Sequence, residues 1–455
     1  MHARSPLDLV SERDTSRRPF RRSLALVVVL TLAGVPISGC KLAANTSRST
    51  RAQPAETTVT TVRATTLEAD SPAPSPESSP PPSTAFVEST TVVEQSVPTE
   101  SFDRPVEVAQ PPATTRPPVR VEGGLVASAA TVRPIPTGAT PRQVAIEILM
   151  NSSRSQWPQM RANAMEALIP DPRRLRGEVV AGLVDENRGV RFVALMSMYE
   201  AKLCELIPMA EDLLQDPSDS VRAAAILALR SCGHNADPSP LARMAGSDDP
   251  EVRANAFVIL GLLGNPSAEV VIRNALGTSM GLVNPSRARI VELQGAAALV
   301  RLGDEEEIQP IRAALFTPSE QGELILLAIQ ALAELGDAGA KGMLVRLVEA
   351  PGNQTRPPEI RLAAATALAQ LGLQEPAPYL RLVAEYAASP DPAVRAQVAA
   401  LLGFVPSETG TTVLANLMQD SSSVVRLAAA GSIVRLSAAT RLATPAEATV
   451  QVGSE

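Results

Sequence analysis

A thiol, an imidazole and a carboxylate lie close together near the middle of the chain. Cys232 and His234 flank one glycine, Asp237 follows shortly after, and Cys204 lies upstream. Side chains of these kinds bind Zn²⁺, and a thiolate beside an imidazole can act as a nucleophile with its base. Metal binding and nucleophilic catalysis are therefore the two chemistries that this cluster could perform.

A repeated segment accounts for the same residues without chemistry. In other copies of the segment, an apolar helix-end residue stands at the position of Cys232, a closing glycine at that of Gly233 and a polar turn residue at that of His234. His234 is also the only histidine beyond the N-terminal leader, which removes most acid–base schemes. We therefore expect no catalytic residue, no metal ligand and no cofactor.

A disulfide between Cys204 and Cys232 stays open at this stage. An oxidising compartment would permit the bond. However, Cys204 is expected to begin one helix and Cys232 to end another, so their Cα atoms could lie too far apart for a bridge.

The segment that contains Cys232 recurs along the C-terminal two-thirds of the chain. Its clearest copies open with Asp-Pro, continue with Val-Arg and end in a run of Ala and Leu. The spacing of roughly 30 to 39 residues is typical of stacked helical repeats. With the residue before the Arg position as the anchor, the copies have their anchors at Met160, Val190, Val221, Val252, Val291, Leu324, Ile360, Val394 and Val425.

Each copy predicts a pair of helices with defined ends. The Asp can accept hydrogen bonds from the first free N–H groups, and the Pro after it needs no N–H partner. Apolar residues at the anchor and at four and eight positions later, such as Val252, Ala256 and Leu260, form one helix face. A Leu-Gly pair then suits a left-handed cap, although Lys202 replaces this glycine in one copy. The second helix often carries Pro in its first turn, as at Pro208, Pro240, Pro310 and Pro378.

This pattern resembles HEAT repeats, in particular the short repeats of phycobilisome-lyase-like proteins, whose first helix opens Asp-Pro-x-x-Val-Arg-x-x-Ala-Ala. The resemblance covers about residues 141–438 and departs where Glu292 and Ile325 occupy the Arg position. It implies an all-α fold, a right-handed α-solenoid of about nine HEAT-like helical hairpins, at residues 139–440. In that family the Asp and Arg serve stacking, so we expect the repeated Arg side chains to be structural rather than a basic ladder for an acidic partner.

The first 40 residues have the order of an export leader. Arginines precede an apolar run at residues 24–33, and Ile37-Ser38-Gly39-Cys40 follows. This order resembles a bacterial lipoprotein signal peptide with its lipobox, in which the Cys receives a diacylglyceryl group. The resemblance implies lipidation of Cys40 and a lipid-anchored position in the cell envelope, facing the periplasm or the exterior. An ordinary secretory signal and a twin-arginine signal at Arg17 and Arg18 are the alternatives.

Residues 41–138 change composition abruptly to Thr, Ser, Pro and Glu. Such a segment buries too little apolar surface to offset its ordering entropy. We therefore expect a disordered tether between the anchor and the repeats. Residues 441–455 lose the repeat pattern and are expected to be disordered as well.

The composition narrows the class of partner. A formal net charge of -7 and 2% aromatic residues argue against a nucleic-acid binder, which needs a basic face and stacking platforms. We expect a non-catalytic scaffold that binds an unknown protein on the concave face formed by the anchor helices. The polar residues three or six positions past the anchors are expected to face that partner: Asn163, Glu166, Asn255, Gln294, Gln330 and Gln397.

Two other functions remain as alternatives. Some relatives of this repeat type attach or isomerise bilins, which implies a phycobilin-lyase-like enzyme. That activity needs polar groups that line a pocket, and the Ala-rich helices show none in the sequence. A cell-envelope assembly or structural factor is the other alternative, which the sequence does not separate from the scaffold.

Overall fold

The computed structural model describes residues 138–443 except 282 and 373–376, and these described residues belong to one compact unit. The predicted leader at 1–40, with Cys40, lies outside the described residues, as do the predicted tether up to 137 and the tail from 444 onward. Within the described ranges every regular element is a helix, which confirms the predicted all-α solenoid.

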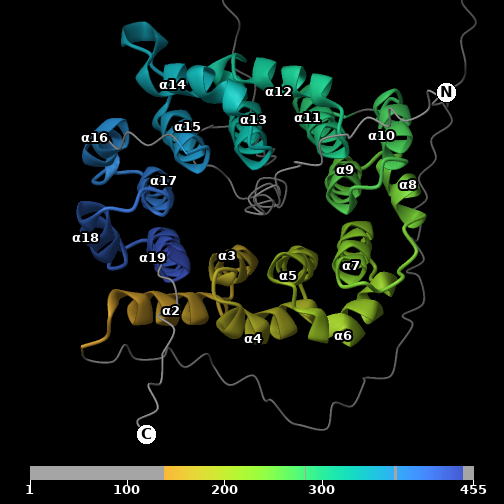
Figure 1. The fold of residues 1–455 in the computed structure, drawn as a ribbon, viewed down its shortest axis with the longest axis horizontal. Helices are drawn as coiled ribbons and strands as arrows, with labels where there is room; N and C mark the ends of the chain where they lie inside the picture. Colours follow the sequence, from red (N-terminus) through yellow and green to blue (C-terminus); the bar gives the residue numbers. More distant parts are fainter. Residues whose placement is uncertain (1–137, 282, 373–376, 444–455) are drawn as a thin grey trace, which may run out of the picture. The chain divides into compact units, whose positions relative to one another are not determined.

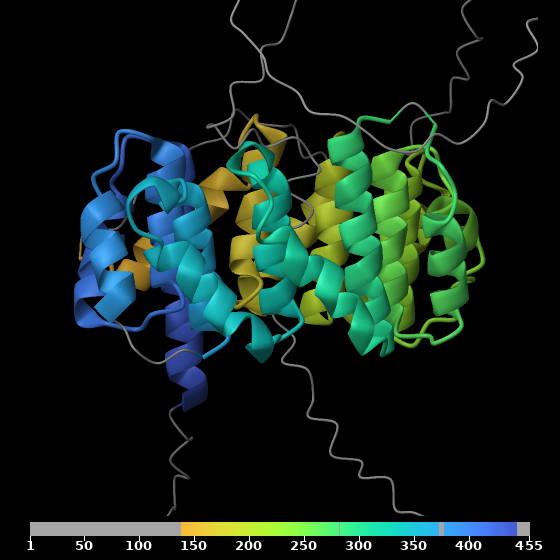
Figure 2. The ribbon, with the colours of Figure 1, turned by 90° about the horizontal axis from the view of Figure 1, so that it is seen from above.

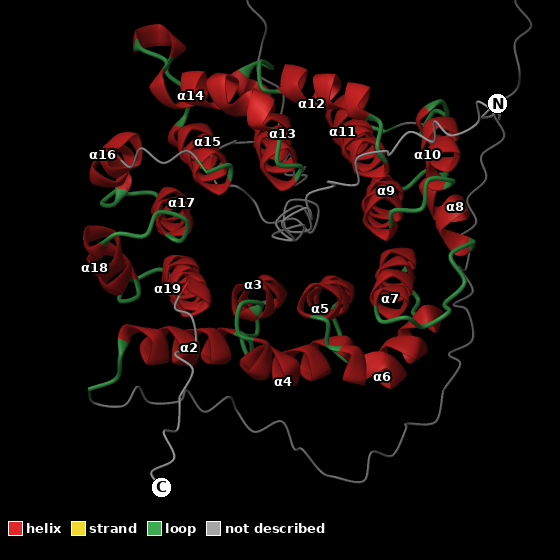
Figure 3. Cartoon of the chain, in the orientation of Figure 1, coloured by secondary structure: helices red, strands yellow, loops and turns green. Residues whose placement is uncertain are grey.

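The helices alternate along the chain between an inner and an outer set (Figure 1, Figure 3). The inner set consists of the nine predicted anchor helices: α3 (Pro158–Leu168), α5 (Arg188–Ala201), α7 (Asp219–Ser231), α9 (Pro250–Leu263), α11 (Pro285–Leu302), α13 (Gly322–Glu334), α15 (Pro358–Gln370), α17 (Pro392–Leu402) and α19 (Ser423–Ala443). The outer set is α2 (Pro141–Ser152), α4 (Pro172–Leu183), α6 (Ile207–Asp212), α8 (Pro240–Ala245), α10 (Ala268–Leu276), α12 (Ile308–Ala314), α14 (Lys341–Glu349), α16 (Ala377–Tyr386) and α18 (Glu408–Leu417).

Short 3-10 helices lie in the connections between these elements. They are η1 (Cys204–Leu206), η2 (Leu213–Gln215), η3 (Glu305–Glu307), η4 (Ser319–Gln321), η5 (Ala338–Ala340) and η6 (Gly352–Gln354). The last inner helix, α19, includes residues 441–443 and so runs past the predicted end of the repeat domain. Of the described helices, none has both the length and the apolar character needed to span a membrane.

The helix ends follow the predicted cap chemistry. The Asp249 side chain accepts a hydrogen bond from the Glu251 N–H at 2.8 Å, and Asp391 accepts one from the Ala393 N–H at 2.8 Å. The closing Gly264 has φ +68°, a left-handed conformation that glycine adopts without steric cost. Lys202 takes the same conformation with φ 55°. The sequence pattern therefore fixed where these helices begin and end.

The core lies between the two helix layers and is built mainly from Ala, Leu, Val and Ile. Small residues let neighbouring inner helices approach closely. A Cβ placed on Gly261 of α9 would lie 2.9 Å from the Ala298 Cα of α11, so only glycine fits this contact. The resulting tight pair of α9 and α11 buries side chains on both helices.

The inner helices close into a ring (Figure 1, Figure 2). The last helix, α19, packs against α2 and α3, the first helices of the same unit. The contact is close, because a Cβ on Gly431 would lie 3.0 Å from the Ala167 Cβ of α3. The concave face expected for an open solenoid is therefore the inner face of a closed ring.

Candidate functional site

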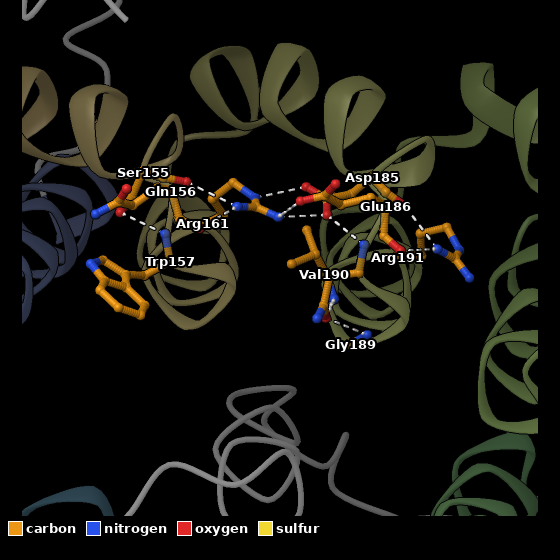
Figure 4. A network of polar contacts seen from close by, with 10 residues as sticks. Ser155, Gln156, Trp157, Arg161, Asp185, Glu186, Gly189, Val190 and Arg191 are labelled. Carbon is orange, nitrogen blue, oxygen red and sulfur yellow. Dashed lines mark hydrogen bonds and ion pairs between the residues drawn. The ribbon is translucent and has the colours of Figure 1, made fainter.

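The repeated arginines join successive repeats (Figure 4). Arg161 donates from Nε and Nη2 to the Asp185 carboxylate at 2.7 Å each, and from Nη1 to the Ser155 carbonyl at 2.9 Å. Asp185 in turn accepts the Asn187 N–H at 2.9 Å. Each such arginine thus fixes the turn before its own helix to the turn of the next repeat. The same arrangement holds Arg191 to Asp216 and Arg395 to Asp420.

At Arg253, whose next repeat lacks this Asp, main-chain carbonyls replace it. Arg253 is buried and donates to the carbonyls of Ser247, Ala275 and Thr278 at 2.7, 3.2 and 3.0 Å. The prediction that the repeated arginines are structural is confirmed for these residues. Their N–H groups are used in contacts within and between repeats.

The cysteines and the histidine of the predicted cluster also make structural contacts. Cys204 and Cys232 form a disulfide with a Cα–Cα distance of 5.4 Å. The disulfide that the sequence left open is therefore present, because the left-handed turn at Lys202 reverses the chain and places Cys204 in η1, next to the end of α7. His234 Nε2 lies 2.7 Å from Glu211 Oε1. Among the described residues, no group of His, Cys, Asp and Glu could hold a metal ion.

Two of the predicted partner-binding residues do not reach the surface. Asn255 is 6% exposed and donates to Ser220 Oγ at 3.0 Å, and Gln294 is 3% exposed. The expectation of an exposed position is wrong for both. Asn255 is covered where α9 packs against α7, at its hydrogen bond to Ser220, and Gln294 lies among the buried residues of α11.

Two others lie on α3 and are only partly covered. Asn163 Oδ1 and Glu166 Oε1 are buried and have no hydrogen-bond partner in the part of the chain that the structure describes. Burial raises the pKa of Glu166 well above its ordinary value. Within the described ranges, both side chains therefore carry an acceptor whose hydrogen-bonding capacity is unmet.

Gln330 and Gln397, the remaining two, line one pocket on the inner side of the ring. This cavity of about 250 Å³, which we call the inner pocket, is lined only by residues of α13, α15, α17 and α19 and by Phe404 just after α17. Its walls are mostly apolar side chains, and Gln397 Oε1 is buried without a partner among the described residues. From the sequence we expected no polar groups to line a pocket, and this expectation is wrong.

Glu334 supplies the acidic group of the inner pocket. Its side chain is 6% exposed and accepts hydrogen bonds from Arg301 Nη2 and Gln330 Nε2, each at 2.8 Å. Burial raises the pKa of Glu334 to about 7, although Arg301 and Gln330 act in the opposite direction and Glu200 adds to the rise. The carboxyl group can therefore change its charge near neutral pH.

Arg435 supplies the basic group. Its guanidinium lies over the Phe404 ring, 4.4 Å from the ring centroid, and it forms no ion pair or hydrogen bond with any described residue. Burial lowers the pKa of Arg435 to about 10, so the group is a cation at neutral pH. Burying a charge that has no charged partner is costly, and Arg435 has none among the described residues.

Their positions within the repeat identify these residues. Glu334, Phe404 and Arg435 each lie ten positions past the anchor of their repeat. Seven residues, or about two helical turns, separate this position from the one three residues past the anchor, where Gln397 lies. The two positions therefore share one helix face. A prediction that continued this helix face by two turns would have included Glu334, Phe404 and Arg435.

The comparisons with known proteins agree with the fold. Residues 178–256 match the family described as HEAT repeats, which supports a HEAT-repeat protein and a helical repeat scaffold. Among solved structures, the chain is similar to human deoxyhypusine hydroxylase in complex with glycerol, with 19% identity and a TM-score of 0.29 over 58% of this chain and 97% of that chain. A likeness this weak carries no argument about activity. No curated protein matches the chain.

Proposed function

We propose that the chain is a non-catalytic scaffold that holds a protein partner on the inner face of its helix ring and is anchored by a lipid on Cys40 to the outer side of a bacterial membrane. One observation carries the binding role. Asn163, Glu166 and Gln397, on the inner helices, end in buried atoms without a hydrogen-bond partner among the described residues. Because buried polar atoms are nearly always hydrogen-bonded, a partner that supplies the missing groups would account for them.

The state of the reactive side chains favours binding over catalysis. Both cysteines beyond the leader are joined in the disulfide, and His234 is held by Glu211. A nucleophile with a neighbouring base is the usual requirement for covalent catalysis. The described residues that could provide this pair are engaged in structural contacts.

The anchor rests on the sequence of the leader. A thiol directly after Ile37-Ser38-Gly39 stands where a lipoprotein receives its diacylglyceryl group. The Thr-, Ser- and Pro-rich residues 41–138 would then connect the membrane to the repeats. A chain of roughly 100 such residues has an r.m.s. span of about 50–60 Å as a flexible coil.

Site-specific photo-crosslinking tests the binding role. A photoreactive residue at Gln397 should form an adduct with a discrete protein in intact cells, and one at Asn163 should capture the same protein. Val270 on the outer helix α10 is 63% exposed and serves as the matched control position. Equal adducts from Val270, or none from either inner position, would contradict the proposal.

Metabolic labelling with an alkyne fatty acid tests the anchor separately. The wild-type protein should incorporate the label and the Cys40→Ser variant should not. The double variant Cys204→Ser with Cys232→Ser should keep the label, because it leaves the lipobox intact. Label retained in Cys40→Ser would rule out lipidation at this position.

A further inference from the structure

The inner pocket combines mostly apolar walls with a cation that has no charged partner among the described residues. We infer that the inner pocket binds an organic monocarboxylate with a small apolar body, whose carboxylate is held by Arg435 and whose body packs against the walls. The inference goes beyond the scaffold proposal and does not require it. The acid could be free in solution or form the C-terminal residue of a polypeptide.

The surroundings of Arg435 leave its N–H donors available. The Phe404 ring lies against the flat face of the guanidinium. Gly403 leaves the space that the guanidinium occupies, because a Cβ there would lie 3.0 Å from Arg435 Nη1 and 2.7 Å from Ser432 Oγ. Stacking uses the face of the guanidinium plane, whereas the N–H groups lie in the plane and point outward. They can therefore donate two parallel hydrogen bonds to a carboxylate.

The cost of burying this cation favours an anionic ligand. A charge taken out of water is expensive unless a partner compensates it, and among the described residues Arg435 has only the Phe404 ring. A carboxylate would supply the missing charge and the missing acceptors together. The guanidinium fork fits that group better than it fits a spherical ion.

The walls define the rest of the ligand. Leu326, Leu327, Ile329, Ala363 and Ala367 offer apolar surface and no hydrogen bonds from their side chains. The volume of about 250 Å³ exceeds the ~150 Å³ that admits benzene and lies below most pockets for drug-sized molecules. The apolar body is therefore small, such as one short alkyl chain or one apolar residue.

Glu334 restricts the charge of the ligand. This carboxyl group lies in the same pocket and is held by Arg301, so it repels a second negative charge when it is ionised. A phosphate or a dicarboxylate would bring two negative charges to Arg435, the one guanidinium among the described residues that line the pocket. The pocket therefore fits a monoanion.

Calorimetric titration of the purified full-length protein with octanoate tests the inference. Octanoate should bind, and octanamide, its neutral counterpart, should bind at least tenfold more weakly, because a hydrogen-bonded charge pair contributes about 1.5–3 kcal/mol. A second pair of probes is a short peptide that ends in leucine, with either a free or an amidated C-terminus. These arms separate a free acid from a polypeptide terminus as the source of the carboxylate.

Two variants tie the binding to the pocket. Arg435→Gln should weaken binding at least tenfold, whereas Arg441→Gln, on the exposed face of the same helix, should not. Gly403→Ala should also weaken binding, because its Cβ would displace the guanidinium. The inference is supported if either acid binds, its amide binds more weakly, and Arg435→Gln and Gly403→Ala weaken the binding. The inference would be overturned if neither octanoate nor the free-acid peptide binds. It would also be overturned if the amides bind as tightly as the acids and the variants bind as tightly as the wild type.

Discussion

At the scale of single residues, the buried Glu334 links the fold to pH. Its folded-state pKa of about 7 lies above the ordinary value of 4.5. Well below pH 4.5 the carboxyl group is protonated in both the folded and the unfolded chain. The folded protein then buries no charge at Glu334. As the pH rises through 7, the folded protein must hold an ionised Glu334, and the free energy of unfolding falls by on the order of 3 kcal/mol.

We therefore expect this decline in unfolding free energy with rising pH to be absent in the Glu334→Gln variant. The difference in unfolding free energy between the wild type and Glu334→Gln should change between pH 4.5 and pH 7, with the wild type becoming relatively less stable as the pH rises. Urea unfolding across this range measures it. Glu292→Gln, at a half-exposed carboxylate on the neighbouring helix α11, should track the wild type at every pH. Parallel curves for the wild type and Glu334→Gln would show that Glu334 does not titrate in this range.

At the scale of elements, the left-handed closing glycines are a testable part of the repeat. Gly264 ends α9 with φ +68°, and a Cβ there would meet no atom within 4 Å. Gly264→Ala should therefore destabilise the protein by about 1–2 kcal/mol through the backbone conformation alone. Gly246, which follows α8 with φ -90°, gives a matched control. Gly246→Ala should be neutral or slightly stabilising, since alanine adopts this φ freely and restricts the unfolded chain. Thermal unfolding compares the two, and equal losses would exclude the left-handed cap as the cause.

The same scale shows what the sequence could predict. Caps, prolines and the Arg–Asp contacts follow from local chemistry, and the structure bears them out at Asp249 and Arg161. The exposure of Asn255 and Gln294 was predicted wrongly because it depends on how closely neighbouring inner helices pack, and the polar character of the two residues does not reveal that distance. The disulfide was left open for a similar reason. It depends on one residue, Lys202, that adopts a conformation normally reserved for glycine.

At the scale of the whole unit, the number of repeats was predictable and their closure was not. Each copy of the repeat encodes its own two helices, so the anchors revealed all nine inner helices of the described chain. Closure depends on the small rotation between neighbours, which accumulates over the series and has no local sequence signal. It brings α19 onto α2 and α3. The same helix carries Arg435, which lines the inner pocket together with residues of α13, α15 and α17.

The contact at Gly431 allows the closed ring to be tested. A leucine there would overlap Ala167, since even a Cβ would lie 3.0 Å from its Cβ, and overpacking of this kind costs about 1–3 kcal/mol. In Gly431→Leu, amide hydrogen exchange should accelerate in α2, α3 and α19, while α9 and α11, in the middle of the series, keep their protection. Repeats contact mainly their neighbours, so the loss should stay near the seam. Gly342→Leu, where a Cβ on α14 would meet nothing within 4 Å, should leave exchange unchanged in all five helices. Full protection of α2, α3 and α19 in Gly431→Leu would mean that the first and last repeats do not hold each other in solution.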